Sequence, residues 1–123
     1  MSTITVDNIR IASESVSRPV AGVAAAYINY NSQQTSGSPS TSGIRGSFNV
    51  SSITEIQIGT TTISYANNFT DSSYTTTLGT NTTHINFTGS TYGPSSVNII
   101  TQGNDNNNNA ASYVTAIAVG ELA

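Results

Sequence analysis

The side chains that could perform chemistry are few and widely spaced along the chain. His84 is the only histidine, cysteine is absent, and the six carboxylates show no motif spacing; they are Asp7, Glu14, Glu55, Asp71, Asp105 and Glu121. Nucleophilic or metal-assisted catalysis needs histidine or thiol groups beside suitable partners, and acid–base catalysis needs two carboxyl groups in one pocket. Alternation around His84 predicts an exposed, outward-facing strand position for it. We therefore expect a protein that is not an enzyme and that holds no metal or cofactor.

Three smaller patterns could bind a ligand, and each also has a plain structural interpretation. Residues 103–109 read GNDNNNN and offer oxygen ligands that suit calcium, but they include one carboxylate and lack EF-hand spacing. We interpret them as a polar loop tip. Asp71, in the run TDSS, predicts a turn in which its side chain accepts hydrogen bonds from backbone amides. Arg45 could pair with Glu55, pair with a neighbouring subunit, or simply be solvated.

Composition argues against several broad classes of function. Charged residues make up only 7% of the 123 residues, against about 25% in an average soluble domain, and the formal net charge is −3. No basic patch exists, which argues against binding to nucleic acid. Charged residues interrupt any N-terminal signal segment, and the longest apolar run, residues 20–28, is far shorter than the roughly 20 residues that span a bilayer. We expect a soluble chain that begins at Met1 and does not insert into membranes.

Alternating apolar and polar residues predict a succession of short strands. They lie at residues 44–50, 53–58, 60–66, 72–79, 82–88, 95–101 and 112–119, separated by Gly, Asn and Pro turn signals. Residues 20–31 predict a further extended run, although their small-residue half would also suit a helix. Residues 32–43 predict a low-complexity loop, and residues 103–112 a long hairpin tip.

Short strands at this spacing are typical of an antiparallel sandwich or barrel. We predict an all-β fold, an antiparallel β-sandwich of jelly-roll-like kind with about seven to nine strands and an extended N-terminal arm. Residues 1–20 would form the arm, used for docking or oligomerisation, and residues 21–123 the sandwich domain. The strand that starts at Ile44 is expected to break at Ser51 and Ser52. The predicted core comprises Ile44, Phe48, Val50, Ile53, Ile63, Tyr65, Phe69, Tyr74, Leu78, Ile85, Phe87, Val97, Ile99, Ile117 and Val119.

The N-terminal arm carries the residues most suited to docking on a partner. Its aliphatic side chains change parity at Asp7 and Asn8, as in a strand that bulges or twists between two neighbours. Its two arginines could make bidentate contacts with partner carboxylates. The predicted docking residues are Ile4, Val6, Ile9, Arg10, Ile11 and Arg18.

Several segments together resemble a known group of proteins. They are STITVDNIRI at residues 2–11, YINYN at 27–31, IRGSFNVSSIT at 44–54, TTISYANNFTDSSYT at 61–75 and SSVNIITQGNDNNNNAASYVTAIAVGE at 95–121. In these segments the chain is similar to virion structural proteins of tailed bacteriophages, of the tail-fibre, head-fibre and capsid-decoration type, as in marine phages. It departs from them after SSIT, where residues 55–59 replace a Gly-rich turn, and in the longer loop at residues 32–43.

The resemblance implies a β-sandwich virion protein without enzymatic activity, usually a homotrimer, and it implies no location on the particle. Our own expectation is the exterior surface of the phage particle. Because 123 residues supply little beyond one domain and an arm, we expect a capsid decoration or a short head fibre or knob. Residues 2–18 would dock it on the major capsid protein or another virion protein by adding a strand to the partner. The alternatives are a tail-fibre tip that binds a host surface glycan through loops 32–43 and 103–109, and a secreted bacterial carbohydrate-binding or fibre module.

Overall fold

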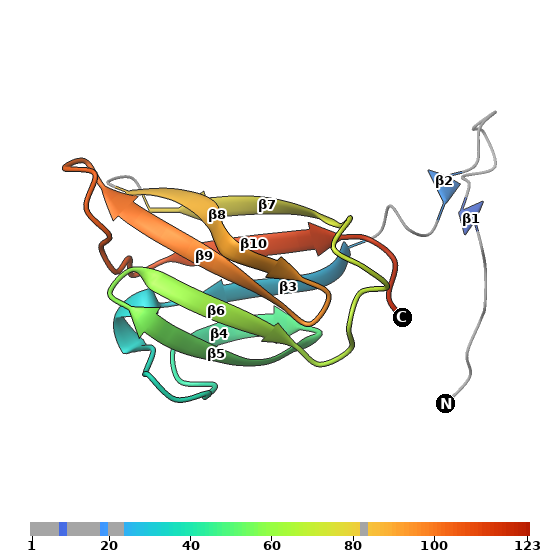
Figure 1. Ribbon diagram of the computed structural model, residues 1–123, viewed down its shortest axis with the longest axis horizontal. Helices are drawn as coiled ribbons and strands as arrows, with labels where there is room; N and C mark the ends of the chain where they lie inside the picture. The colour runs from blue at the N-terminus through green and yellow to red at the C-terminus, as the bar shows by residue number, and fades with distance from the viewer. Residues whose placement is uncertain (1–7, 10–17, 20–23, 82–83) are drawn as a thin grey trace.

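The computed structural model describes residues 8–9, 18–19, 24–81 and 84–123, and in these ranges the chain forms ten strands and one short 3₁₀ helix (Figure 1). The strands are β1 (Asn8–Ile9), β2 (Arg18–Pro19), β3 (Ala24–Tyr30), β4 (Ile44–Phe48), β5 (Val50–Gln57), β6 (Thr60–Tyr65), β7 (Thr75–Thr80), β8 (His84–Gly93), β9 (Ser96–Gly103) and β10 (Val114–Val119). The helix η2 covers Ser32–Gln34. The extended conformation predicted after residue 20 is therefore found at β3.

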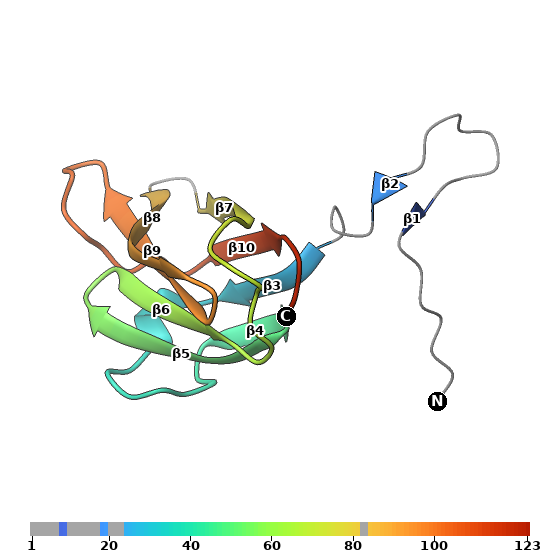
Figure 2. The same ribbon diagram turned by 45° about the vertical axis from the view of Figure 1, so that its right-hand side comes forward.

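Eight of these strands form two four-stranded antiparallel sheets that pack face to face (Figure 2). One sheet has the order β4-β3-β10-β7 and the other β5-β6-β9-β8. β1 and β2 pair with each other in a separate two-stranded sheet. The predicted all-β antiparallel sandwich is confirmed, and its eight main strands fall within the predicted number.

Hairpins and crossings alternate along the sandwich. The pairs β3–β4, β5–β6 and β8–β9 stay within one sheet, whereas the chain changes sheets after β4, β6, β7 and β9. The last strand, β10, lies between β3 and β7 and pairs with both. The link from β9 to β10 is thus a crossing between sheets, and the hairpin predicted at residues 103–112 is a small local one, closed by the bridge between Gln102 and Asn108.

Asn49 ends β4 and redirects the chain into the opposite sheet. Its backbone has a φ of 56°, in the left-handed region that Asn tolerates better than most residues. Its side-chain Nδ2 donates to the carbonyls of Ala25 (3.1 Å) and Asn67 (3.0 Å), and its Oδ1 accepts from the Asn67 N–H (2.7 Å). The break predicted at Ser51 and Ser52 is wrong, because both residues lie within β5.

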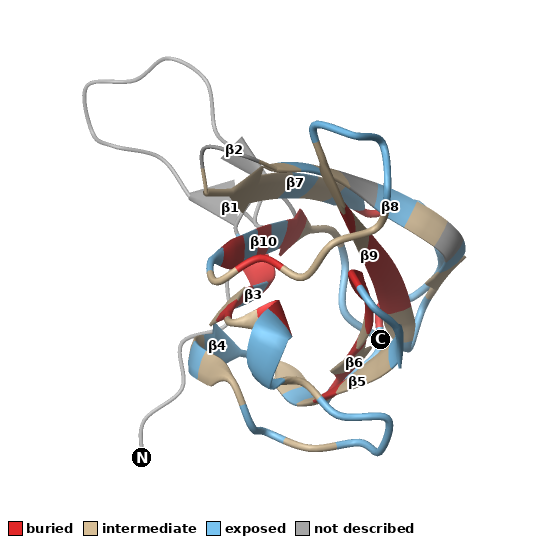
Figure 3. Ribbon diagram, turned by 90° about the vertical axis from the view of Figure 1, so that its left-hand side faces the viewer, coloured by how far each residue is buried: buried red, intermediate tan, exposed pale blue. Residues whose placement is uncertain are grey.

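The core lies between the two sheets, and Figure 3 shows buried residues (red) in strands of both. Seven predicted core residues are buried: Ile53, Ile63, Tyr65, Phe69, Tyr74, Val97 and Ile99. Ile44, Val50 and Leu78 pack against them, and Val119 is half-buried. Burial raises the pKa of the Tyr30 hydroxyl, an effect that the Thr61 side chain partly offsets, so this unpredicted core residue stays neutral.

Three predicted core residues are wrong, because they face outward. Phe48 is 53% exposed, Ile85 58% and Ile117 46%. A register shift opposite Arg45 leaves Ile44 inward and turns Phe48 to the outer face, since a one-residue slip reverses every side chain beyond it. Ile117 alternates with the smaller residues Val114, Ala116 and Ala118, which face inward in its place. Ile85 faces outward on an edge strand, and the side chain of Phe87 lies outside the described part of the structure.

A cluster of four aromatic rings closes the end of the sandwich at which β3 begins. Phe69 stacks on Tyr74 (centroids 4.1 Å apart), Tyr74 stacks on Tyr92 (4.5 Å), and Tyr65 meets Phe69 edge-on (4.9 Å). Burial raises the pKa of Tyr65 and of Tyr74. Gly120 allows this packing, because a Cβ atom on it would lie 2.5 Å from the Cβ of Tyr74. Such aromatic pairs add about 0.5–1.5 kcal/mol each beyond the area they bury.

Two isoleucines of β5 offer a direct test of this core. Ile53 is completely buried, whereas Ile56 is 60% exposed. We expect Ile53→Ala to lower the free energy of unfolding by about 2–5 kcal/mol through lost burial and a cavity. Ile56→Ala, the matched control, should cost less than about 1 kcal/mol. Urea denaturation followed by tyrosine fluorescence measures both; equal costs would contradict the assigned register of β5.

Candidate binding site at the loop end

Three connections meet at the end of the sandwich away from the start of β3 (Figures 1 and 3). They are the β3–β4 loop at residues 31–43, the β5–β6 turn at residues 58–59 and the β9–β10 loop at residues 104–113. Two of them are the loops that the sequence suggested for glycan binding. The structure therefore brings both loops together, and adds the β5–β6 turn between them.

Ser32 joins the first and last of these loops. Its backbone N–H (2.9 Å) and its hydroxyl (2.9 Å) both donate to the carbonyl of Ala111, and the Ala111 N–H donates back to the hydroxyl (2.7 Å). Both residues are buried, Ala111 completely. Hydrogen bonds between buried groups carry a large penalty if one partner is lost, so this reciprocal pair fixes the two loops relative to each other.

Gly59 allows the β5–β6 turn to touch the last loop. Its φ is 74°, and a Cβ atom on it would lie 2.6 Å from the Asn109 nitrogen. The Gly59 carbonyl accepts from the Thr101 N–H (2.8 Å), and the Thr101 carbonyl accepts from the Asn109 N–H (2.9 Å). A residue other than glycine would therefore be strained and would displace the loop.

Asp105 organises the tip of the β9–β10 loop. Its carboxylate accepts from the Asn107 side chain (2.9 Å) and backbone N–H (3.1 Å), while Asn106 adopts a φ of 61°. These hydrogen bonds, that from the Asn107 side chain first, lower the pKa of the Asp105 carboxyl group below its ordinary value. The described residues contain no group of three histidine, cysteine or acidic side chains that could hold a metal. The tip is thus a turn built from its own amides.

A shallow, widely open groove of about 780 Å³ lies between β5 and this tip. It is lined by Glu55, Gln57, Ile58, Asn106, Asn107 and Asn108. The amides of Gln57 (3.3 Å) and Asn108 (3.4 Å) both donate to the Thr60 hydroxyl, which holds them in place. Amides donate and accept hydrogen bonds at once, and Ile58, 65% exposed, adds an apolar contact. Such a groove can bind a neutral, hydroxyl-rich molecule.

The β3–β4 loop covers the outer edge of β5. Ser40 and Ile53 exchange backbone hydrogen bonds of 3.0 and 2.8 Å, and the Glu55 N–H donates to the Ser36 carbonyl (2.7 Å). The Thr35 hydroxyl donates to Glu55 Oε2 (2.8 Å). The loop therefore satisfies an edge strand that would otherwise offer unpaired backbone groups.

The structure shows the contacts of the charged and titratable residues that the sequence analysis named. Glu55 bonds to Thr35, so of the three roles considered for Arg45 the pairing with Glu55 is not found. Instead Arg45 Nη1 donates to the Ser112 carbonyl (2.6 Å), and its guanidinium lies 4.0 Å from the centre of the Tyr113 ring. Asp71 caps its turn as predicted, since its Oδ1 accepts from the Ser73 N–H (2.7 Å). His84, expected to be exposed, is half-buried.

The predicted docking residues lie mostly beyond what the structure describes. Ile4, Val6, Arg10 and Ile11 fall outside the described residues. Ile9 and Arg18 are backbone partners in the β1–β2 ladder. The structure thus brings this one pair together and leaves the docking role a prediction.

Sequence reasoning did not find the groove residues on β5. The strand predicted at residues 53–58 placed only Ile53 in the core and gave Ile56 and Ile58 no role. The alternation that buries Ile53 turns Ile56 outward, and Ile58 lies in the turn after β5, so both are exposed. The available signal was the departure from the phage-protein pattern at residues 55–59.

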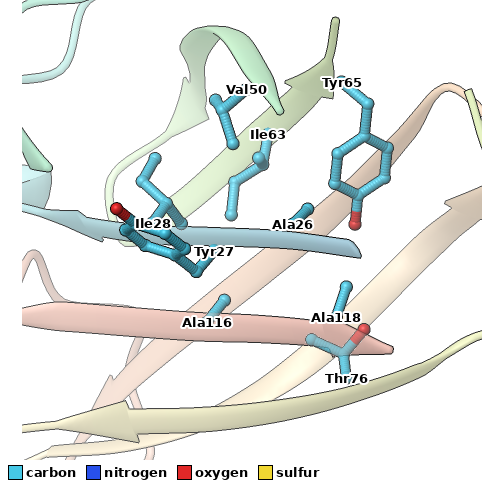
Figure 4. A pocket seen from close by; sticks show the side chains of 9 residues that line it. All are labelled: Ala26, Tyr27, Ile28, Val50, Ile63, Tyr65, Thr76, Ala116 and Ala118. Atoms are coloured by element: carbon cyan, nitrogen blue, oxygen red, sulfur yellow. The ribbon is translucent and has the colours of Figure 1, made fainter. Parts of the chain in front are cut away.

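A second hollow lies inside the sandwich but is too small for a ligand (Figure 4). The cavity is about 10 Å³ and is lined by Ala26, Tyr27, Ile28, Val50, Ile63, Tyr65, Thr76, Ala116 and Ala118. A single water molecule needs roughly 10–15 Å³. The cavity is a packing defect where small alanines of β3 and β10 face larger side chains of the other sheet.

Comparisons with known proteins identify no relative: no family model, no curated protein and no solved structure matches the chain. Among the described residues, no helix is long and apolar enough to cross a membrane. Assignment of function therefore depends on the residues themselves.

The hydrogen bonds to Asp105 make the loop tip sensitive to pH. Because they lower the pKa of the folded carboxylate, they stabilise the tip above the unfolded pKa and are lost as the pH falls through the folded one. We expect the side-chain carbon of Asp105 to titrate below its ordinary value in an NMR experiment, and Asn107→Ala to raise the midpoint. An unchanged midpoint in Asn107→Ala would show that this amide does not stabilise the carboxylate.

Proposed function

We propose that the protein is a non-enzymatic exterior component of a bacteriophage particle, either a capsid decoration or a short head fibre or knob. The observation that supports this most is that the two ends of the sandwich differ. The chain enters through β3 at one end, where the C-terminus also lies, and the loops gather at the other (Figure 1). A domain attached through its N-terminal segment would thus present the loop end outward.

The attachment end offers its own surface for a virion partner. A hollow of about 210 Å³ there is lined by Phe69, Thr70, Asp71, Ser73, Tyr74, Gly120 and Glu121. The Thr70 N–H donates to the Glu121 carbonyl (2.9 Å), which ties the C-terminal residues to the β6–β7 connection. The preceding segment, which supplies Arg10, Arg18 and four aliphatic residues, would add a strand to the partner.

The surface chemistry also fits repeated packing on a particle. Only 7% of the residues are charged, and Thr is the commonest residue type at the exposed strand positions that the structure describes. Hydroxyl groups hydrate well and form hydrogen bonds across subunit contacts without the cost of burying charges. Neighbouring copies could therefore approach closely on the virion.

Removal of residues 1–18 should abolish incorporation into particles. We expect particles assembled in the presence of the truncated chain to lack it, because the docking segment is gone while the sandwich from Ala24 onward remains. Quantitative mass spectrometry of purified particles measures incorporation, and circular dichroism checks folding. Asn107→Ala at the loop end is the control that should be incorporated normally. Full incorporation of the truncated chain would refute the arm as the anchor.

A second candidate function is a tail-fibre tip that binds a host surface glycan. It is favoured by the convergence of loops 32–43 and 103–109 beside the amide-lined groove. If it holds, fluorescently labelled protein should bind host cells, and Asn106→Ala with Asn107→Ala should weaken binding about tenfold by removing amide donors. Asn68→Ala, at the attachment end, is the matched control. Failure of the labelled protein to bind cells would leave the capsid-decoration function.

A further inference from the structure

The outer face of the β4-β3-β10-β7 sheet carries a ridge of large side chains. Phe48, Tyr27, Ile117 and Thr77 lie in one row across its four strands, because the first three are backbone partners in turn and Ile117 also pairs with Thr77. Phe48 is 53% exposed, Tyr27 47% and Ile117 46%. The rings of Phe48 and Tyr27 stack with centroids 6.3 Å apart. Contacts between side chains of neighbouring strands thus hold this apolar ridge in place at the exposed surface.

The next row on the same face is a trough. It contains Gly46, Asn29, Thr115 and Gly79, which are again backbone partners across the four strands. A Cβ atom built on Gly46 would meet no atom within 4 Å, so the trough is open at this end, whereas the Thr115 hydroxyl covers Gly79 at the other end. On the far side of the trough, Arg45 lies over the ring of Tyr113. The trough is therefore bounded by larger side chains on both sides.

We propose that this face binds the same face of a second copy of the chain. A two-fold axis that runs along the rows, between ridge and trough, would reverse the strand direction and superpose each ridge on the other copy's trough. Phe48 would then enter the open space above Gly46 of the second copy, with Tyr27 over Asn29 and Ile117 over Thr115. A two-fold interface requires a surface that complements itself, and these rows have that property.

Charge and size favour a copy of this chain over another partner. The ridge and the trough contain no acidic or basic side chain, so two identical faces meet without charge repulsion. The same axis places Arg45 of each copy opposite the row of Val119 and Thr75 in the other copy. The two Arg45 side chains therefore lie apart from each other. A face four strands wide and six residues long covers roughly 400 Å² in projection. Two such faces approach the roughly 1,000 Å² of a small specific interface, which implies reversible association.

Gly46→Val is the most specific test of this pairing. The added side chain has room in the single chain and suits a strand, so thermal stability should be kept, yet it fills the trough that Phe48 must enter. Phe48→Ser removes the ridge instead. Thr54→Val, on the outer face of the other sheet, is the matched control. Full-length protein and variants are compared by sedimentation velocity over a range of concentrations.

We expect the unaltered protein and Thr54→Val to form dimers, and each of Gly46→Val and Phe48→Ser to raise the dimer dissociation constant about tenfold or more. A monomer at every concentration, a dimer insensitive to both variants, or a trimer like that implied by the phage resemblance would overturn the proposal. Because the assay uses purified chain alone, its outcome is independent of whether the arm docks on a virion.

Discussion

The rest of the molecule depends on the antiparallel ladder between β3 and β10. It runs from Val114 opposite Tyr30 to Val119 opposite Ala24, and so joins residues far apart in the sequence. Its inner side chains, which include Ile28 and Tyr30, form half of the core. Its register also brings Ser32 beside Ala111, and thereby assembles the loop end. Because such contacts close long loops, we expect the ladder to form late and to limit the folding rate.

Hydrogen bonds of polar side chains hold several loops and strand crossings in place, a role that apolar packing has in proteins with larger cores. The Asn49 side chain supports the crossing from β4 to β5 through four hydrogen bonds, and Ser32 holds two loops together. On the outer face of the second sheet, Thr62 donates to Asn98 (2.8 Å). Each bond contributes only about 0.5–1.5 kcal/mol net, yet a buried group left without its partner would cost more. The abundance of Ser, Thr and Asn thus has a structural reason as well as a surface one.

The sequence predicted the fold class and most strand positions because these depend on local alternation and on turn residues. It failed where register depends on a bulge or on a choice between two apolar faces. The outward position of Phe48 could not be predicted without knowledge of the register shift opposite Arg45. To predict that Ile117 faces outward, one would have had to assign Ala116 and Ala118 to the core instead. Pairwise strand geometry, absent from a single sequence, decides both positions. The two loops of the candidate site were identified, but the part played by Ile58 in the β5–β6 turn was not.

The edges of the sheets explain why a face is the more suitable surface for self-association. A sandwich can associate by pairing edge strands or by packing faces. The edge of β5 is occupied by residues 36–40 of the β3–β4 loop. The edge strand β4 is only five residues long and has a register shift, and a shift between Thr88 and Tyr92 interrupts the edge strand β8. These three edges are irregular or covered, which discourages strand addition at them, whereas the fourth edge, β7, pairs with β10 without a register shift. The β3–β10 ladder holds Tyr27 and Ile117 outward at the centre of its sheet. The ladder that builds the core therefore also builds the surface most able to bind a second copy.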